Sequence, residues 1–545
     1  MRPATKRVLQ LVFAFACCTA APAQQTAITS YIHQGWDTLS RSMAECATFG
    51  DTKLNTKPIL YLAAEESIPT AVQDLPQRCH IEVRHLPRAI HHEGDLSPDE
   101  TPTPGLLYLP NKYVVPGGRF NEMYGWDSYF IILGLLADGR VDLARGMAEN
   151  FFYEIEHYGS VLNANRTYYL TRSQPPFLSS IVMDIYRAEL PTHPDQARAF
   201  LQKALPFLIK DHDLWTSPPH LAGATGLSRY IDLGHDPVPE MADDSTYYTD
   251  VVHYLLAHPS SANATYLRRA PESSQPDHSA APATTAAGYT LTESFFTGDR
   301  AMRESGFDTS FRFGPFSGST QDYAPVCLNA LLYKYERDIA EIETILGQGA
   351  QHYLSLARVR KAAMNKLMWD DRAGLFMDYN NRTHARSSYR YITAYYALWT
   401  GLATRQQAIR LAANIKLFEH PGGLAMSTTQ SGMQWDAPFG WAPTNWLTID
   451  GLRRYGLVAD ARRIAREFSS TIENNFALDH TIREKYNVES ADANVAVAAG
   501  YKANVIGFGW TNGVYLQMQK LLTTPAPGRD ILPAHHGPHV SASAP

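Results

Sequence analysis

Residues 116–130 gather side chains that could bind a neutral, hydroxyl-rich compound. The stretch begins with an irregular Pro-Gly-Gly turn, and glycine lets a backbone approach a ligand closely. It then supplies Arg119, Trp126 and Asp127 within a few positions. Fixed hydrogen-bond donors and acceptors beside flat apolar faces suit a ligand of this kind. Taken singly, Trp126 fits a core position and Arg119 fits an ion pair with Asp127, but the whole run favours a binding site.

A second stretch of the same character lies far downstream. It reads Gln-Trp-Asp-Ala-Pro-Phe-Gly-Trp-Ala-Pro over residues 434–443. Together the two stretches resemble the two signatures of the trehalase family of glycoside hydrolases, in the family's order. The sequence of the first stretch, Phe-Asn-Glu-Met-Tyr-Gly-Trp-Asp, is most similar to that of the intracellular, fungal-type branch of the family. The resemblance covers roughly residues 110–520 and implies hydrolysis of α,α-trehalose to two glucose molecules, with no cofactor.

Cleavage of a glycosidic bond requires two carboxyl groups, set roughly 6.5–9.5 Å apart in an inverting enzyme to leave room for a water. The chain has 54 Asp and Glu residues, so composition cannot select the pair. Asp308 matches the family's Ser-Gly-x-Asp motif, whose aspartate is the general acid. Glu484 matches its Glu-Lys-Tyr motif, whose glutamate is the general base. From local sequence alone, Asp308 fits a helix N-cap equally well, and Glu484 fits a surface ion pair with Arg483 or Lys485.

The resemblance also implies which residues contact the sugar. They are Arg119, Trp126, Asp127, Asn163, Arg172, Arg268, Glu272, Gly306, Gln434, Trp435 and Trp441. Two segments depart from the family pattern and bear on substrate affinity and range. Residues 268–273 read Arg-Arg-Ala-Pro-Glu-Ser, which displaces one arginine, and residues 498–502 replace a glycine-rich lid and its sugar-binding glutamate.

The elements that must position these residues are helices. From residue 130 onward, apolar side chains recur at helical spacing, as in residues 141–155 and 452–468. Further helices are expected at residues 195–208, 328–346, 353–368 and 393–411, whereas the alternation typical of strands is scarce. Many helices with short connectors indicate stacked helical hairpins and an all-α fold. The resemblance implies an (α/α)6 toroid, or barrel.

The start of the chain has the composition of a signal peptide. Residues 1–23 contain basic residues, then an apolar run, then Ala-Pro-Ala before Gln24. This predicts cleavage after Ala23 and a periplasmic or secreted protein. Beyond it we expect an N-terminal extension over residues 24–110, a catalytic domain over 111–522, and a disordered Pro- and His-rich tail over 523–545. Within the catalytic domain, residues 258–287 read as a long loop.

Charge and cysteine content limit the partners. The net charge of −6 argues against nucleic acid or an anionic membrane as the main partner. After signal cleavage, three cysteines would remain, and their spacing is not that of a zinc ribbon. Cys46 and Cys79 could form a disulfide in an oxidising compartment. The His-His pairs at 91–92 and 535–536 lack the spacing of a helical metal motif. We therefore expect no metal. The resemblance implies a small disaccharide as substrate, and we expect a monomer.

Two other functions fit parts of this pattern. The altered segments would suit a related α-toroid glucosidase that acts on another α-glucoside. A catalytically inactive sugar-binding protein would also retain the aromatic and arginine positions. Because both Asp308 and Glu484 are present, the sequence favours an active enzyme over the binding protein.

Overall fold

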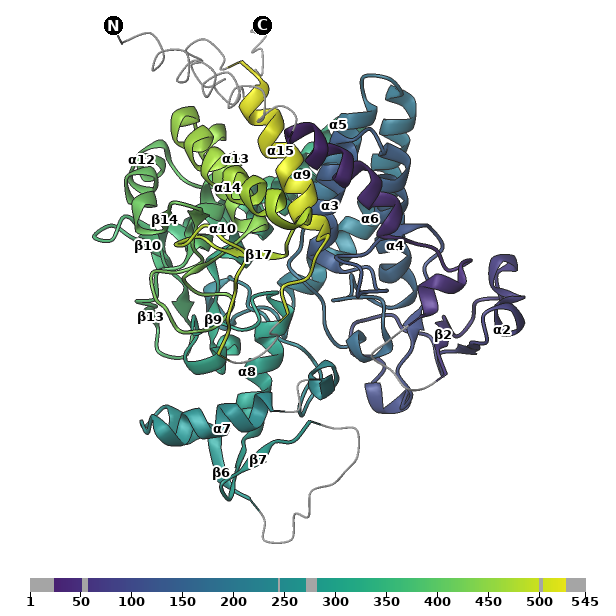
Figure 1. Cartoon of the computed structure of the whole chain (residues 1–545), viewed down its shortest axis with the longest axis horizontal. Helices are drawn as coiled ribbons and strands as arrows, with labels where there is room; N and C mark the ends of the chain where they lie inside the picture. Colours follow the sequence, from purple (N-terminus) through teal and green to yellow (C-terminus); the bar gives the residue numbers. More distant parts are fainter. Residues whose placement is uncertain (1–23, 51–56, 244–245, 271–281, 499–502, 526–545) are drawn as a thin grey trace, which may run out of the picture.

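The computed structural model describes residues 24–50, 57–243, 246–270, 282–498 and 503–525, and all structural statements below concern these residues. Most of the longer helices form an inner and an outer ring according to their mutual contacts. Figure 1 shows where these helices lie, with α15 beside α3. The inner ring consists of α3 (Gly125–Ala137), α5 (Leu178–Glu189), α9 (Val326–Leu346), α11 (Tyr396–Trp399), α13 (Ala442–Arg454) and α15 (Gly509–Thr523). Each of these helices contacts the next, and α15 returns to contact α3, which closes the ring.

The outer ring alternates with the inner one along the chain. It consists of residues 24–38, α4 (Val141–His157), α6 (Pro194–Thr216), α10 (Gln351–Leu367), α12 (Arg405–Asn414) and α14 (Val458–Asp479). The outer α4 buries Ala144, Ala148, Phe151 and Ile155 on one face, as the sequence pattern predicted. By contrast, α3 is buried continuously from Gly125 to Leu135, which explains why its sequence is apolar all round. The expected all-α (α/α)6 barrel is therefore confirmed.

Two glycines let the first and last inner helices pack together. A Cβ atom at Gly513 would lie 2.1 Å from the carbonyl oxygen of Phe130, and one at Gly134 would lie 2.5 Å from the Cα of Gly513. No larger residue fits at either position without moving the backbone. This close approach closes the inner ring between α3 and α15.

Strands are short and stand at the ends of helices. The antiparallel pairs are β1 (Ser40–Arg41) with β5 (Tyr113–Val114), β10 (Trp369–Asp370) with β11 (Leu375–Phe376), β14 (Glu419–His420) with β15 (Gly423–Leu424), and β16 (Phe439–Trp441) with β17 (Lys485–Asn487). In a further sheet, β12 (Tyr379–Asn380) lies between β9 (Tyr323–Ala324) and β13 (Ala385–Arg386).

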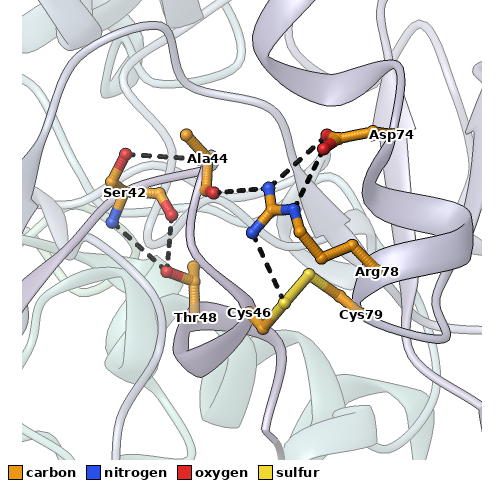
Figure 2. The surroundings of a disulfide bond; sticks show 7 residues. All are labelled: Ser42, Ala44, Cys46, Thr48, Asp74, Arg78 and Cys79. Atoms are coloured by element: carbon orange, nitrogen blue, oxygen red, sulfur yellow. Dashed lines mark hydrogen bonds and ion pairs between the residues drawn. A yellow bond between two sulfur atoms is a disulfide. The ribbon is translucent and has the colours of Figure 1, made fainter.

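The N-terminal part contributes a small parallel sheet. Here β2 (Ile59–Leu62) lies between β3 (Glu82–His85) and β4 (Leu106–Leu107). Cys46 and Cys79 form a disulfide that joins a short 3-10 helix to the end of α2 (Leu75–Arg78) (Figure 2). The helix over residues 24–38 buries Ile28, Ile32 and Trp36 in the core shared with the barrel.

Two expectations about local structure were wrong. The single helix expected over residues 393–411 is broken, because the chain turns at Gly401 with φ +75° before α12 begins. The expected loop over residues 258–287 contains β6 (Leu267–Arg269) and β7 (Thr285–Ala286), which pair with β8 (Tyr289–Leu291). With α7 (Tyr247–Ala257), these strands form an appendage below α8 (Glu293–Glu304) that has its own aromatic core (Figure 1).

Three predicted features fall wholly or mostly outside the described residues. They are the signal peptide, the lid segment at 499–502 and the tail beyond residue 525. Among the described helices, none has the length and apolar character that a membrane span requires.

Candidate active site

The sequence motifs lie directly before inner helices. The first signature leads into α3, the segment with Arg172 into α5, and the second signature into α13. Backbone hydrogen bonds join the first two: the amide of Gly125 donates to the Asn163 carbonyl at 3.2 Å, and the amide of Asn163 donates to the Arg172 carbonyl at 2.8 Å. The first signature and the segment from Asn163 to Arg172 are therefore held together where α3 and α5 begin.

The second signature is paired with the segment that contains Glu484. In the β16–β17 ladder, Trp441 is the direct partner of Lys485, the residue after Glu484. The amide of Trp435 also donates to the carbonyl of Thr309 at 3.1 Å, which links the signature to the residue after Asp308. This short ladder thus brings the two predicted catalytic carboxyls to the same region.

Asp308 follows the turn at the end of α8. Its side chain is 38 % exposed, and Nη1 of Arg303 lies 3.7 Å from its Oδ2. The side-chain amide of Gln434 donates a hydrogen bond to the backbone carbonyl of Asp308. Protein packed around the carboxyl desolvates it and raises its pKa to about 6, against the lowering effect of the Arg303 charge. Asp308 is thus reachable from outside yet keeps its proton more readily than an ordinary aspartate.

Gly306 makes the turn before Asp308 possible. Its φ is +75°, in the left-handed region that favours glycine. A Cβ atom there would lie 2.9 Å from Cε2 of Trp126. The first signature and the Asp308 segment therefore pack directly against one another through this glycine.

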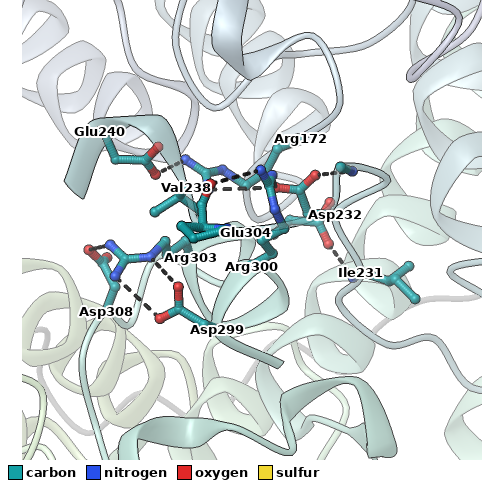
Figure 3. A network of polar contacts seen from close by, with 12 residues as sticks. Arg172, Ile231, Asp232, Val238, Glu240, Asp299, Arg300, Arg303, Glu304 and Asp308 are labelled. Atoms are coloured by element: carbon teal, nitrogen blue, oxygen red, sulfur yellow. Dashed lines mark hydrogen bonds and ion pairs between the residues drawn. The ribbon is translucent and has the colours of Figure 1, made fainter. Parts of the chain in front are cut away.

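Charged side chains around Asp308 form a buried network (Figure 3). Arg303 lies between Asp308 and Asp299, whose carboxyl is 3.1 Å from the guanidinium and accepts hydrogen bonds from Tyr247 and Tyr248. The opposed charges fix the direction of the Arg303 side chain. Sequence reasoning missed Arg303, because an arginine at a helix end has no distinctive pattern.

The second half of this network centres on Arg172. Its guanidinium forms an ion pair with Glu240 and lies 3.6 Å from Asp232, which is in turn 2.8 Å from Arg300. Although burial alone would raise the pKa of Glu240, the charge of Arg172 lowers it below its ordinary value. Glu240 was also missed, because no motif surrounds it in the sequence.

Glu484 is buried and forms an ion pair with the adjacent lysine. Nζ of Lys485 lies 3.1 Å from Oε2 of Glu484 and also donates to the carbonyl of Ala503 at 2.9 Å. The indole N–H of Trp510 donates to the Glu484 backbone carbonyl at 3.2 Å. A buried carboxylate requires a counter charge, and Lys485 provides it.

Asp127 connects the two predicted catalytic residues electrostatically. It is buried in the first turn of α3. Burial raises its pKa well above the ordinary value, and the negative charges of Glu484 and Asp308 raise it further. Both predicted catalytic carboxyls therefore lie within electrostatic range of Asp127.

The predicted tryptophans form one buried aromatic cluster. Trp435 and Trp441 are stacked with centroids 3.8 Å apart, and Trp126 lies 5.8 Å from Trp435. Trp510 packs edge-on against all three. The indole of Trp441 donates to the Gln434 carbonyl at 2.8 Å. These rings join the first signature, the second signature and the start of α15.

Two further predicted contacts are exposed, and one lies outside the described residues. Arg119 is exposed, with its guanidinium 5.3 Å from the centroid of the Phe120 ring. Arg268 is exposed on β6, in the appendage. Glu272 lies outside the described residues, as do Gly500 and Tyr501 of the lid segment.

Several buried polar atoms of the network lack a hydrogen-bond partner among the described residues. They include Nε of Arg172, Oε2 of Glu240 and Oε1 of Gln434. A buried polar atom without a partner reduces the stability of the fold unless a ligand or a water molecule forms a hydrogen bond with it. Donors and acceptors of this kind can bind the hydroxyl groups of a sugar.

Comparison with known proteins gives one consistent result. The family model described as Trehalase matches residues 20–523. A cytosolic neutral trehalase of Saccharomyces cerevisiae is 35 % identical over 90 % of this chain and 71 % of its own length. A probable trehalase of Eremothecium gossypii is 34 % identical over 90 % of this chain and 72 % of its own length.

The solved structures agree. The neutral trehalase of Saccharomyces cerevisiae matches with a TM-score of 0.75 and 33 % identity, over 91 % of this chain and 93 % of that chain. A GH63 mannosylglycerate hydrolase from Thermus thermophilus matches with a TM-score of 0.50 and 16 % identity, over 75 % of this chain and 96 % of that chain. The second likeness shows the fold alone.

The predicted location is contradicted by these relatives. The signal peptide and the periplasmic or secreted location were inferred from the composition of residues 1–23. Relatives that match most of the chain, including those of Saccharomyces cerevisiae, Kluyveromyces lactis and Neurospora crassa, are named cytosolic enzymes. Basic residues before a short apolar run are a feature of composition, and this feature did not predict the location correctly.

Proposed function

Since this chain belongs to the trehalase family of glycoside hydrolases and is an α,α-trehalase, we propose that Asp308 and Glu484 carry out the reaction as general acid and general base. The enzyme hydrolyses α,α-trehalose to two glucose molecules with inversion at the attacked carbon. Inversion requires an acid on one side of the anomeric carbon and a base with its water on the other.

The observation that carries this assignment is the environment of Asp308. A general acid must hold a proton at the working pH and still reach the substrate. Protein packed around the Asp308 carboxyl desolvates it and raises its pKa to about 6, while 38 % of the side chain remains exposed to solvent. These two properties together support Asp308 as the group that protonates the bridging oxygen.

Glu484 is proposed as the base that activates water. The proton of the water passes to the Glu484 carboxylate while the water oxygen bonds to the anomeric carbon. The bond from that carbon to the bridging oxygen breaks, and this oxygen takes the proton of Asp308. Both products leave as neutral glucose, and transfer of a proton from Glu484 to Asp308 through solvent restores the enzyme.

The sugar hydroxyls are proposed to bind the unpartnered atoms of the network. Nε of Arg172 can donate, whereas Oε2 of Glu240 and Oε1 of Gln434 can accept. Arg303 would contribute beside Asp308. The remaining proposed contacts are Arg119, Trp126, Asp127, Asn163, Arg268, Glu272, Gly306, Trp435 and Trp441.

A substrate panel with matched variants tests the proposal. We expect the wild type to hydrolyse trehalose and to act far more slowly on kojibiose and other α-glucosides. Glu484→Gln should lose activity while folding normally, whereas the control Glu489→Gln, an exposed glutamate bonded to Gln430 at 2.7 Å, should remain fully active. Near-normal turnover by folded Glu484→Gln would remove Glu484 from the mechanism.

We propose that the enzyme works as a monomer. The exposed large apolar side chains of the described residues are scattered along the chain, as in Ile68, Leu190, Val359 and Leu478, rather than gathered in one segment. Light scattering of the purified protein should give the mass of one chain. A concentration-independent mass of two chains would contradict this.

A further inference from the structure

Three buried side chains from distant parts of the sequence meet beside the Arg172 network. They are Glu93, His220 and Glu304, with 5 %, 0 % and 0 % of their surfaces exposed. One ligand atom from each residue lies within 4.8 Å of the other two. Glu93 comes from the loop after β3, His220 from the loop after α6, and Glu304 from the last residue of α8.

The charges of this cluster are not balanced by the described protein. Nε2 of His220 lies 3.2 Å from Oε1 of Glu304, and the amide of Ile231 donates to the other oxygen of Glu304 at 2.6 Å. Among the described residues, neither carboxylate oxygen of Glu93 has a partner at hydrogen-bond geometry, and the Ser173 backbone is the polar group that lowers its pKa. Among the described residues, no lysine or arginine forms an ion pair with Glu93 or Glu304. Buried carboxylates without a counter charge are strongly disfavoured.

The geometry suits a cation shared by the three residues. Ligand atoms on a tetrahedral ion with bonds of about 2.0–2.1 Å are separated by roughly 3.3 Å, close to the 3.2 Å between His220 and Glu304. Imidazole with carboxylates is a ligand set suited to zinc and similar transition ions. A hydrogen bond between His220 and Glu304 would leave Glu93 unsatisfied, whereas a divalent ion would engage all three residues.

The surrounding backbone holds the three ligands in place without an ion. The amide of Gly94 donates to the carbonyl of Leu170 at 3.0 Å, which fixes the Glu93 loop. The amide of Arg229 donates to the carbonyl of His220 at 2.8 Å. The ring of Trp215 packs edge-on against His220 at 4.8 Å. The site is therefore built before any ion arrives.

We propose that Glu93, His220 and Glu304 bind one divalent transition-metal ion, of which Zn²⁺ is the representative probe. The ion would join the N-terminal loop, the loop after α6 and the C-terminal end of α8. Since Glu304 directly precedes the turn that presents Asp308, the ion has a structural role in fixing that turn. The spacing of the three residues explains why a search for helical metal motifs does not find them.

Binding is tested on the full chain after chelator treatment and dialysis. The wild type should take up about one equivalent of Zn²⁺, measured by elemental analysis, and its Tm should rise by about 2 °C or more. Glu93→Gln should weaken Zn²⁺ binding at least tenfold and lose the Tm increase. A matched control is the double variant His91→Gln/His92→Gln, which removes neighbouring histidines of the same loop and should bind like the wild type.

Cobalt gives a readout that needs no variant. Co²⁺ added to the treated wild type should produce visible absorption bands that Zn²⁺ abolishes. The proposal is overturned if no such bands appear, if Zn²⁺ does not raise the Tm of the wild type, or if Glu93→Gln and the wild type bind Zn²⁺ equally. Loss of binding in the His91→Gln/His92→Gln control would likewise assign the ion to surface histidines and overturn it.

Discussion

Nη1 of Arg303 lies 3.7 Å from Oδ2 of Asp308, at the turn that follows α8. The same guanidinium is held by Asp299, so its position is fixed from the opposite side. Burial raises the pKa of Asp308 to about 6, and the charge of Arg303 restrains that rise. This pair sets the pH at which the proposed general acid loses its proton.

The first prediction concerns the pH dependence of kcat/KM on trehalose. Activity requires protonated Asp308, so kcat/KM should fall as pH rises through about 6. Arg303→Gln removes a positive charge, which should raise the pKa of Asp308 and move this fall upward by about one pH unit. Arg303→Lys keeps the charge, so the pH at which kcat/KM falls should shift less. An unmoved profile in Arg303→Gln would show that Asp308 does not control it.

The second prediction concerns Asp308→Asn. Activity should drop by the ~10²–10⁴-fold typical of a lost general acid. The folded pKa of Asp308, about 6, lies above the ordinary 3.8. Its contribution to stability is therefore fully present below pH 3.8 and is lost as pH rises through 6. At pH 7.5 the variant lacks a desolvated carboxylate, so it should be more stable than the wild type.

The stability difference should shrink as pH falls toward 4. Urea unfolding at pH 4.5 and 7.5 measures it. Asp371→Asn is the control, because Asp371 is 85 % exposed and pairs with Arg410 at the surface, and this variant should show no gain at pH 7.5. A loss of stability in Asp308→Asn that grows from pH 4.5 to 7.5 would contradict the argument.

The third prediction concerns Gly306→Ala. The substitution meets both a left-handed backbone and a Cβ position 2.9 Å from Trp126. We expect it to cost about 2–4 kcal/mol and to reduce kcat. Gly347→Ala is a matched control, with φ +78° and no atom within 4 Å of the Cβ position, and should cost only about 1 kcal/mol. Equal costs would mean that contact with Trp126 is unimportant.

The fourth prediction concerns the disulfide between Cys46 and Cys79, which are 33 positions apart. Closing a loop of this length reduces the entropy of the unfolded chain and stabilises the fold by about 3–4 kcal/mol. The double variant Cys46→Ser/Cys79→Ser should lose about this free energy of unfolding in urea. Because the bond lies in the N-terminal part, the kcat of folded enzyme should not change. A variant as stable as the wild type would show that the loop is constrained by other contacts.

The sequence alone could predict many of the helices, but it could not predict where some of them break. The apolar stripe over residues 141–155 predicted a helix, and the structure buries this face of α4. The break at Gly401 was missed, since apolar spacing continues across it. The β6–β8–β7 appendage was missed because its composition is typical of loops.

Some residues of the candidate site could also be predicted from the sequence, and others could not. Asp308 and Glu484 could be singled out because family-like motifs surround them. Arg303 and Glu240 could not, because their importance comes from the charges that the fold places beside them. The export prediction failed because it rested on composition alone, whereas relatives that match most of the chain are named cytosolic enzymes.

The most direct test of the mechanism is the configuration of the first glucose released. Early-time proton NMR of trehalose hydrolysis, recorded before mutarotation, measures the α and β anomers separately. Inversion by Asp308 and Glu484 predicts equal amounts of β-glucose and α-glucose at first. Initial release of α-glucose alone would indicate a retaining mechanism and contradict the role of Glu484 as a base that activates water.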